Sequence, residues 1–244
     1  MMKRQNAMMK TRFLCLILSA ALLFSFSAFA EGSGKKSPED LLSGMTLREK
    51  IAQMMIPSFR VWQEVPETED GEQPAEEAPK TNITELNDQI REMVAREHFG
   101  GILLFGENFT DPEQTLRLIS DLQTANQNGG GLPQLIFVDQ EGGSVNRIPY
   151  STIGVSNMAL GASGDPENAR KMAFIHGEEI GLLGIHPDFA PVVDVNNNAA
   201  NPVIGVRSFS DDPQNVAQYG CAYLAGLHDA GIMAALKHFP GHGN

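Results

Sequence analysis

Short runs of apolar residues alternate along this chain with longer segments in which apolar residues recur every three or four positions. The short runs predict strands buried on both faces, and the longer segments predict amphipathic helices. The predicted strands are 53–59, 101–105, 135–139, 188–195 and 233–239. The predicted helices are 38–54, 83–99, 111–128, 165–183 and 212–230. The last three helices open with an Asp-Pro pair, which suits an N-cap and a first turn.

This alternation, with no hairpin signal between the strands, predicts parallel βα units in an open doubly wound sheet or an eightfold barrel. Polar residues gather where the predicted strands end, at Asp139, Glu141, Asp194 and the Lys237–His238 pair. Barrel enzymes carry their chemistry at that edge. No Gly-x-Gly-x-x-Gly or phosphate-loop motif follows a strand. We therefore predict an α/β fold of the (β/α)8 barrel type, incomplete, with about the first five βα units.

The first thirty residues have the pattern of a signal peptide. Basic residues precede an apolar stretch at 13–26, and Ala28-Phe29-Ala30 supplies small residues before a cleavage point. The apolar stretch is shorter than the ~20 residues that a membrane helix needs. We predict cleavage near Ala30, export to a periplasm or the exterior, and no membrane span in the mature chain. The alternative is an uncleaved N-terminal anchor.

The charge of the chain excludes some partners. The formal net charge is −12, from 18 basic and 30 acidic side chains. The predicted signal peptide holds four of the basic residues and no acid, so its removal leaves 14 against 30 and a net charge of −16. Nucleic acid and anionic membranes would repel such a chain. Only Cys221 would remain, so we expect no intrachain disulfide, no thiolate metal site and no cofactor.

Two segments fall outside the regular alternation. Residues 31–37 form a polar linker, so the predicted domain spans 38–244. Within it, residues 64–79 are rich in acids and nearly free of apolar side chains. This composition predicts a solvated insertion rather than a part of the core.

The first candidate site is the stretch VDQEGGSVNR, residues 138–147. Asp139 and Glu141 leave a buried strand before two glycines, which allow a sharp turn and the close approach of a ligand. A carboxylate held there can accept hydrogen bonds from neighbouring sugar hydroxyls, and Arg147 can supply a planar set of donors. The alternative interpretation is a surface salt bridge at a turn.

The second candidate is Arg207 in the loop NPVIGVRSFSDDP, residues 201–213. A single loop arginine is usually solvated, but the proline, glycines and phenylalanine around it indicate a loop of defined shape. This composition modestly favours a functional role for Arg207.

The third candidate is KHFPGHG, residues 237–243. His238 and His242 have the spacing of zinc ligands on a helix, but the intervening Pro240 excludes a helix, so a metal site is not expected. Adjacent strand residues point to opposite sides. Lys237 and His238 therefore share a pocket only if the strand twists or ends between them. The alternative is a solvated lysine beside a buried, neutral histidine.

His176 differs from these candidates. It lies on the apolar face of the predicted helix 165–183. We predict a packed, hydrogen-bonded histidine without a role in the site.

Taken together, four motifs resemble glycoside hydrolase family 3, and most closely its bacterial β-N-acetylhexosaminidases. They are VDQEGGSVNR, DFAPVVDV, NPVIGVRSFSDDP and KHFPGHG, in this order and spacing. The resemblance covers about residues 40–244, apart from the acidic insertion. It implies a (β/α)8 barrel that removes terminal β-linked N-acetylglucosamine from a glycan with retention. It further implies that the sugar is bound by Asp139, Arg147, Arg207, Lys237 and His238.

The chain departs from the family pattern in two ways. Ser144 stands where the branch commonly has arginine, although the second arginine of that motif is present as Arg147. In the family, an acid/base histidine and a nucleophilic aspartate follow the position of KHFPGHG, and retaining hydrolysis needs both. The resemblance thus implies that this chain holds a sugar-binding wall and none of the catalytic residues, and that it is inactive by itself.

Two alternatives to this function remain open. One is a β-glucosidase of the same family, although the Pro-Gly-His that follows Phe239 favours the hexosaminidase branch. The other is an exported carbohydrate-binding protein without catalysis.

Overall fold

The computed structural model of the protein describes residues 36–64 and 79–242. The predicted signal peptide, nearly all of the linker and most of the acidic insertion lie outside the described residues. The chain divides into two compact units, Met1–Thr46 and Leu47–Asn244. Among the described residues, no helix is both long enough and apolar enough to cross a membrane.

The described part of the first unit contains one short helix, α2 (Pro38–Gly44). Ser37 caps it: its hydroxyl accepts a hydrogen bond from Asp40 N at 3.1 Å, and Asp40 Oδ2 accepts one from Ser37 N at 3.2 Å. This reciprocal pair satisfies two of the free N–H groups at the start of the helix.

The sequence predicted one continuous helix over 38–54, and this prediction was wrong. Helix α2 ends at Gly44, Met45 is extended, and a second helix, α3, spans Leu47–Ala52. Thr46 and Glu49 have the Thr-x-x-Glu spacing of a capping box, which favours a new helix start. The Ser37 cap of α2, the extended Met45 and the Thr-x-x-Glu spacing before α3 thus outweigh the apolar spacing that continues across both helices.

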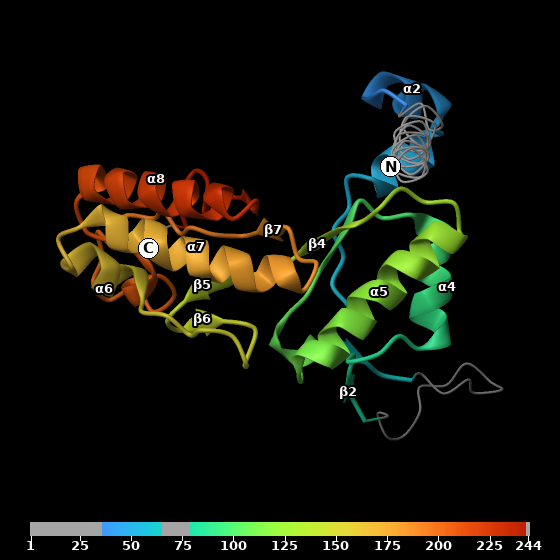
Figure 1. Ribbon diagram of the computed structural model, residues 1–244, viewed down its shortest axis with the longest axis horizontal. Coiled ribbons are helices and arrows are strands. Elements are labelled where there is room, and N and C mark those ends of the chain that lie inside the picture. Colours follow the sequence, from blue (N-terminus) through green and yellow to red (C-terminus); the bar gives the residue numbers. More distant parts are fainter. Residues whose placement is uncertain (1–35, 65–78, 243–244) are drawn as a thin grey trace, which may run out of the picture. The chain divides into compact units, whose positions relative to one another are not determined.

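A parallel strand pair begins the regular part of the second unit. β3 (Gly101–Leu103) pairs with β4 (Leu135–Phe137). α4 (Asp88–Glu97) and α5 (Pro112–Asn128) pack against each other beside this pair (Figure 1). Asn87 caps α4 by accepting a hydrogen bond from Ile90 N at 2.8 Å, which explains why the helix starts later than predicted.

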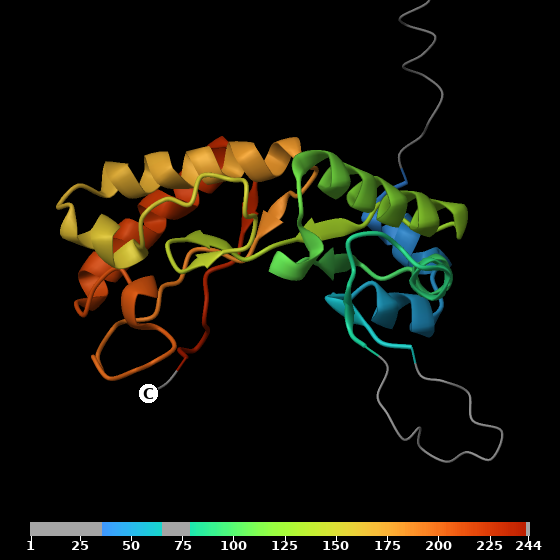
Figure 2. The ribbon, with the colours of Figure 1, turned by 90° about the horizontal axis from the view of Figure 1, so that it is seen from below.

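A second parallel pair lies further along the chain. β7 (Pro187–Asp188) pairs with β8 (Met233–Ala234), and isolated parallel bridges join Val138 to Asp188 and Val192 to Lys237. α7 (Pro166–Leu182) and α8 (Pro213–Asp229) lie side by side over this region (Figures 1 and 2). The helices and parallel pairings at these positions agree with the predicted βα units, although each strand is shorter than its apolar run.

Two antiparallel pairs contradict the expectation that the chain has no hairpins. β1 (Val61–Trp62) pairs with β2 (Thr81–Asn82). β5 (Gln140–Gly142) pairs with β6 (Val145–Asn146) across a tight turn. Gly142 and Gly143 have φ of +81° and +57°, a region that residues with a side chain rarely adopt. The two glycines thus allow a hairpin whose strands, of three and two residues, are too short to show an alternating sequence pattern.

The predicted strand 53–59 was also wrong. It is absent among the described residues, and this segment runs as irregular backbone with Met54, Met55 and Ile56 exposed. One hydrogen bond, from Leu103 N to Pro57 O at 3.0 Å, joins it to β3. Pro57 has no N–H to donate, so a regular ladder cannot continue there.

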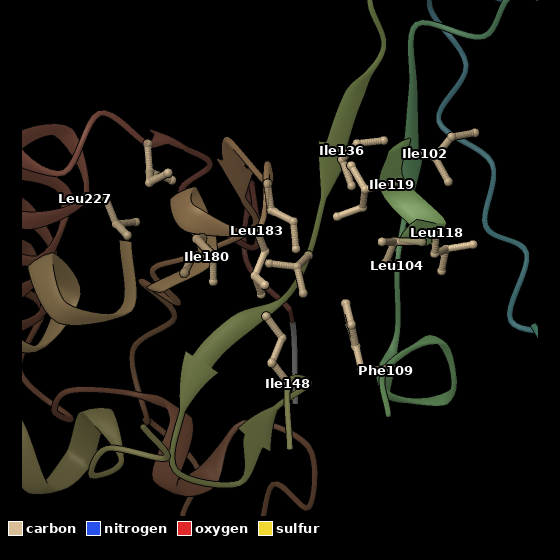
Figure 3. Close-up of a cluster of buried hydrophobic side chains, with 14 of the residues drawn as sticks. Ile102, Leu104, Phe109, Leu118, Ile119, Ile136, Ile148, Ile180, Leu183 and Leu227 are labelled. Carbon is tan, nitrogen blue, oxygen red and sulfur yellow. The ribbon is translucent and has the colours of Figure 1, made fainter. Parts of the chain in front are cut away.

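Short elements complete the second unit: η1 (Gly106–Asn108), α6 (Asn157–Ala162) and η2 (Gly205–Arg207). The hydrophobic core runs beneath the strand pairs. Ile102 and Ile136 come from β3 and β4, Leu118 from α5, and Ile180 and Leu227 from α7 and α8 (Figure 3). This core fixes the strand ends from which the polar residues emerge.

Candidate functional site

The hairpin β5–β6 is held by one buried side chain, that of Gln140. Its Nε2 donates to Asn146 Oδ1 at 2.5 Å and to Ser151 Oγ at 2.9 Å. Its Oε1 accepts from Arg147 N at 3.0 Å, and its own backbone N–H donates to Asp188 Oδ1 at 2.9 Å. These bonds fix the direction in which the flanking Asp139 and Glu141 leave the backbone.

Four charged side chains meet at this hairpin and form what we call the ion cluster: Asp139, Glu141, Arg207 and Lys237. Lys237 Nζ lies 2.6 Å from Asp139 Oδ1 and 2.6 Å from Glu141 Oε1. Arg207 forms a two-pronged pair with Glu141, from Nε to Oε2 and from Nη2 to Oε1, both at 2.8 Å. The cluster joins the ends of three separate segments and carries two charges of each sign.

Glu141 is the most enclosed member, with a side chain that is 2 % exposed. Burial by itself would raise the pKa of Glu141. The hydrogen bond from Arg207 and the charge of Lys237 act the other way, and together they leave the pKa of Glu141 below its ordinary value. The hydrogen bond to Glu141 also raises the pKa of Arg207. Glu141 is therefore an ionised anchor for two cations.

Asp188 lies close to the ion cluster and is fully buried. Its Oδ1 accepts the bond from Gln140 N, while its Oδ2 is buried without a partner. Burial raises the pKa of Asp188 well above the ordinary value, and the hydrogen bond from Gln140 and the charge of Lys237 oppose this only in part. Burial therefore disfavours a charge on Asp188, and the two anions and two cations of the ion cluster balance without it.

The other half of the candidate site centres on Asp194. Its Oδ2 lies 2.6 Å from His238 Nδ1 and accepts from His238 N at 3.2 Å. Its Oδ1 accepts from His242 N at 2.7 Å. The rings of His238 and His242 meet edge to face with centroids 5.3 Å apart. Burial would raise the pKa of Asp194, but the bonds from His238 and His242 outweigh it and lower that pKa.

Arg147 lies apart from the ion cluster. Its guanidinium carbon is 5.4 Å from the centroid of the Phe105 ring, and the guanidinium carbon of Arg60 is 4.4 Å from the same centroid. Arg60 is paired with Glu107, whereas Arg147 Nε is buried and has no hydrogen-bond partner. A cation beside an aromatic face is favourable, but it leaves most donors of Arg147 unused.

A cavity of about 600 Å3 opens beside the Asp194–His238 pair. Asparagines from the loop after β7 form much of its wall, together with Asp194, His238 and His242. The residues of the wall are Val193, Asp194, Val195, Asn196, Asn197, Asn198, Asn201, Ile204, Leu236, His238, Phe239, Pro240, Gly241 and His242. The ion cluster is not part of this wall, so the cavity is bordered by only one of the predicted sugar-binding residues.

The structure thus brings together three of the five predicted residues, Asp139, Arg207 and Lys237. His238 follows Lys237 in the chain but contacts a different carboxylate, and Arg147 stands at Phe105. The alternative of a solvated lysine beside a buried histidine does not hold, because the side chain of Lys237 is 15 % exposed and that of His238 33 %. The Lys237–His238 peptide bond is cis.

Sequence reasoning left two of the contact residues without a role. Glu141 and Asp194 were recognised as acids at strand ends, yet only the structure shows which cations and N–H groups they hold. The sequence contained a signal for each, because both acids lie at or just beyond the end of a buried apolar run, as Asp139 does. Asp188 gave no signal beyond an acid at the start of a strand.

His176 is packed and hydrogen-bonded, as predicted. It is fully buried, and its Nδ1 lies 3.3 Å from the hydroxyl of Tyr223. Burial lowers the pKa of His176, which favours the neutral ring. A side chain on Gly142 or Gly154 would strike this ring. His176 thus supports the hairpin from below.

The unused hydrogen-bonding capacity indicates the ligand chemistry. An ammonium has three donors, and Lys237 spends two of them on carboxylates. Asp139 Oδ2 has no hydrogen-bond partner among the described residues, and Arg207 keeps N–H groups beyond those that donate to Glu141 and to the backbone oxygen of Val203. Mixed donors and acceptors of zero net charge suit a neutral, hydroxyl-rich ligand. Over the ranges 36–64 and 79–242, no group of three or more His, Cys, Asp and Glu side chains could hold a metal ion.

Sequence comparison places this chain among known glycosidases. The family described as "Glycosyl hydrolase family 3 N terminal domain" matches residues 46–244. Beta-hexosaminidase A of Pseudoalteromonas piscicida is 43% identical over 168 residues, which are 66% of this chain and 28% of that protein. The beta-hexosaminidase of Stenotrophomonas maltophilia strain K279a is 41% identical over 172 residues, 66% of this chain and 48% of that protein.

Structural comparison gives the same family. A glycoside hydrolase family 3 beta-N-acetylglucosaminidase from Paenibacillus sp. str. FPU-7 superposes with a TM-score of 0.70 at 39% identity, over 82% of this chain and 34% of that one. NagZ from Neisseria gonorrhoeae, in complex with N-trifluoroacetyl-D-glucosamine, superposes with a TM-score of 0.59 at 32% identity, over 66% of this chain and 48% of that one. The chain spans half or less of the length of these relatives.

Proposed function

Because the chain belongs to glycosyl hydrolase family 3, we propose that it forms the sugar-binding wall of a β-N-acetylhexosaminidase, an enzyme that removes terminal β-linked N-acetylglucosamine from a glycan. The similarity to beta-hexosaminidases and to a beta-N-acetylglucosaminidase supports this substrate class. The activity belongs to the whole enzyme, and the residues of this chain provide the part that binds the sugar.

The proposed architecture is a (β/α)8 barrel, to which this chain contributes the first βα units. The parallel pairs β3–β4 and β7–β8, with helices between them, support that arrangement. The bridges from Val138 to Asp188 and from Val192 to Lys237 link successive strands at the edge where barrel enzymes keep their chemistry.

The observation that carries the proposal is the ion cluster. Glu141, itself enclosed, holds Arg207 and Lys237 in place, and Lys237 also holds Asp139. The fixed orientation lowers the entropy lost when a ligand binds. In the proposed role, Asp139 accepts hydrogen bonds from two neighbouring hydroxyls, and Lys237 and Arg207 donate to the others.

The two remaining predicted residues have complementary places in this scheme. His238 faces the cavity of about 600 Å3, which has room for a monosaccharide and part of its neighbour. Arg147 would turn its unused donors from the Phe105 ring toward the sugar. By the family resemblance, a histidine acid/base and an aspartate nucleophile belong to segments that follow this region, and together they give retention of configuration.

Binding calorimetry tests the proposal directly. Residues 31–244 are titrated with chitobiose, and cellobiose serves as the matched ligand that lacks the acetamido groups. The proposal expects saturable binding of chitobiose and weaker binding of cellobiose. Equal or tighter binding of cellobiose favours a β-glucosidase, and the absence of binding to either disaccharide rules out the proposed wall.

Activity is tested in a chimera. Residues 46–242 replace the matching segment of the Stenotrophomonas beta-hexosaminidase, and hydrolysis of an aryl β-N-acetylglucosaminide is measured. The chimera should turn over this substrate and should lose activity when Asp139 is changed to Asn. A folded chimera that binds chitobiose without turnover favours a carbohydrate-binding protein instead.

The proposal also includes export. The basic start, the apolar stretch 13–26 and Ala28-Phe29-Ala30 support a cleaved signal peptide. A periplasmic or extracellular enzyme would meet its glycan outside the cytoplasm.

A further inference from the structure

The carboxylate of Asp194 receives three hydrogen-bond contacts from one short segment, residues 238–242. His238 contributes its backbone N–H at 3.2 Å and its Nδ1 at 2.6 Å, and His242 contributes its backbone N–H at 2.7 Å. The side chain of Asp194 is 6 % exposed. By contacting residues 238 and 242, this buried carboxylate restrains the backbone of the segment and the ring of His238.

These contacts decide which nitrogen of His238 carries the proton. Both oxygens of Asp194 face N–H donors, so the group acts as an acceptor and is ionised, and its lowered pKa agrees with this. An acceptor 2.6 Å from Nδ1 requires a hydrogen on Nδ1. In the neutral ring, Nε2 then has a free lone pair.

We propose that Asp194 is a positioning residue for sugar binding, which holds His238 as the Nδ1–H tautomer and fixes the 238–242 segment so that His238 Nε2 accepts a hydrogen bond from a sugar hydroxyl. This inference rests on the proposed sugar-binding function and specifies the direction of the hydrogen bond between His238 and the sugar. His238 was expected to be one more polar group of the wall, whereas the contact at Nδ1 makes Nε2 of this tautomer an acceptor, in contrast to the donors Lys237 and Arg207.

The surroundings of the pair fit this role. The cavity beside His238 is lined by Asn196, Asn197 and Asn198, whose amides can hydrogen-bond the remaining hydroxyls of the same ring. A partner that fixes the tautomer of a binding histidine raises the strength of the bond at the other nitrogen, as carboxylates do behind metal-binding histidines. The Asp194 contact thus affects affinity without touching the sugar.

The tautomer is measured first, in the unaltered chain. Nitrogen-15 NMR in mildly alkaline solution, where imidazoles are neutral, distinguishes a protonated Nδ1 from a protonated Nε2. We expect Nδ1 of His238 to be protonated. A ring protonated at Nε2 overturns the proposal, and this result needs no variant.

Asp194→Asn is the decisive variant. Its amide can keep one oxygen for His242 N–H but then offers NH2 to His238 Nδ1, which would have to become an acceptor. In the flipped amide orientation, the NH2 group would face the backbone N–H of His242, so two donors would meet. We expect the ring to switch to the Nε2–H form, as happens when an aspartate behind a histidine becomes asparagine. The affinity for chitobiose should fall about tenfold, the usual effect of losing one hydrogen bond.

Two controls separate positioning from general stability. Asp229→Asn removes an exposed carboxylate that pairs with Arg170, and it should change neither the tautomer nor the affinity. In a His238→Gln background, Asp194→Asn should cost little further affinity, because the two residues act through one another. Additive losses, or an Asp194→Asn variant that melts earlier with an unchanged tautomer, overturn the proposal.

Failure of the proposed function gives a different result. If the unaltered chain binds no chitobiose, the sugar-binding wall is wrong. The tautomer of His238 and its response to Asp194→Asn still decide whether Asp194 positions the ring.

Discussion

The ammonium of Lys237 lies 2.6 Å from an oxygen of Asp139, a residue 98 positions earlier in the chain. Glu141 shares the same ammonium and is itself held by Arg207. Residues from the segment after β8, from β5 and the position before it, and from η2 thus form one neutral cluster. Removing any member leaves its partners with uncompensated charge in a poorly solvated place.

Lys237→Met should lower both sugar affinity and stability. The strand-end position alone predicts an intact fold, but the two carboxylates around Nζ make this lysine part of the interior. We expect unfolding in urea to become easier by ~1.5–3 kcal/mol, the usual contribution of a charged hydrogen bond, and chitobiose affinity to fall about ten- to a hundredfold. Lys171→Met, at an exposed position of α7, is the matched control. A variant as stable and as tightly binding as the unaltered chain contradicts the ion cluster.

Glu141→Gln should change how stability depends on pH. The folded-state pKa of Glu141 is lowered, so its contribution is complete above the unfolded value of about 4.3 and is lost as pH falls through the folded pKa. We expect the variant to be less stable than the unaltered chain at neutral pH and nearly equal to it in strong acid. Urea midpoints between pH 3 and 7 measure this, with Glu113→Gln as the exposed control. Parallel curves would show that Glu141 is not an ionised anchor.

Asp188→Asn should change the pH dependence of stability in the opposite direction from Glu141→Gln. The folded-state pKa of Asp188 is raised, so the native protein keeps a proton that the unfolded chain releases above about pH 3.9, and stability falls as pH rises through that range. Asparagine keeps the acceptor for Gln140 N and removes this penalty. The variant should therefore gain stability relative to the unaltered chain from pH 3 to 7, while Asp121→Asn, at a half-exposed position of α5, shows no such trend. A loss that grows with pH would mean that Asp188 is charged.

His176→Gln should lower the melting temperature and leave chitobiose affinity nearly unchanged. The ring is buried, contacts Tyr223 and lies against Gly142 of the hairpin, but it does not line the cavity. A loss of about 1–3 kcal/mol is typical of a buried polar contact. His228→Gln on the exposed face of α8 is the control. An affinity loss without a change in melting temperature would give His176 a direct role in binding.

Export is tested by the N-terminal sequence of the protein recovered outside the cytoplasm. The signal-peptide pattern predicts a mature chain that begins near Glu31. Ala30→Arg should block this cleavage because the position before the cut requires a small residue, and Ala21→Leu within the apolar stretch should not. Recovery of the uncleaved chain in the membrane fraction would instead support the N-terminal anchor.

Much of the fold could be predicted from local patterns. The helices that open at Asp111, Asp165 and Asp212 begin where predicted, because an Asp-Pro pair acts on its own first turn. The strands β3 and β4 could also be predicted from a local pattern, because a strand buried on both faces is a continuous apolar run. The hairpin β5–β6 was missed because its strands are too short for an alternating pattern to appear.

The sequence by itself determined the family motifs, the positions of α5, α7 and α8 and of the parallel strands, and the edge at which the polar residues emerge, because these depend on neighbours within a few positions. Only the tertiary structure decided the partners. It assigned Lys237 to Asp139 and Glu141, Arg207 to Glu141, and His238 to Asp194, pairs separated by 44 to 98 positions. Coulomb attraction and hydrogen bonding act over a few ångströms of space, so a pattern along the chain shows which groups are present but not which of them meet.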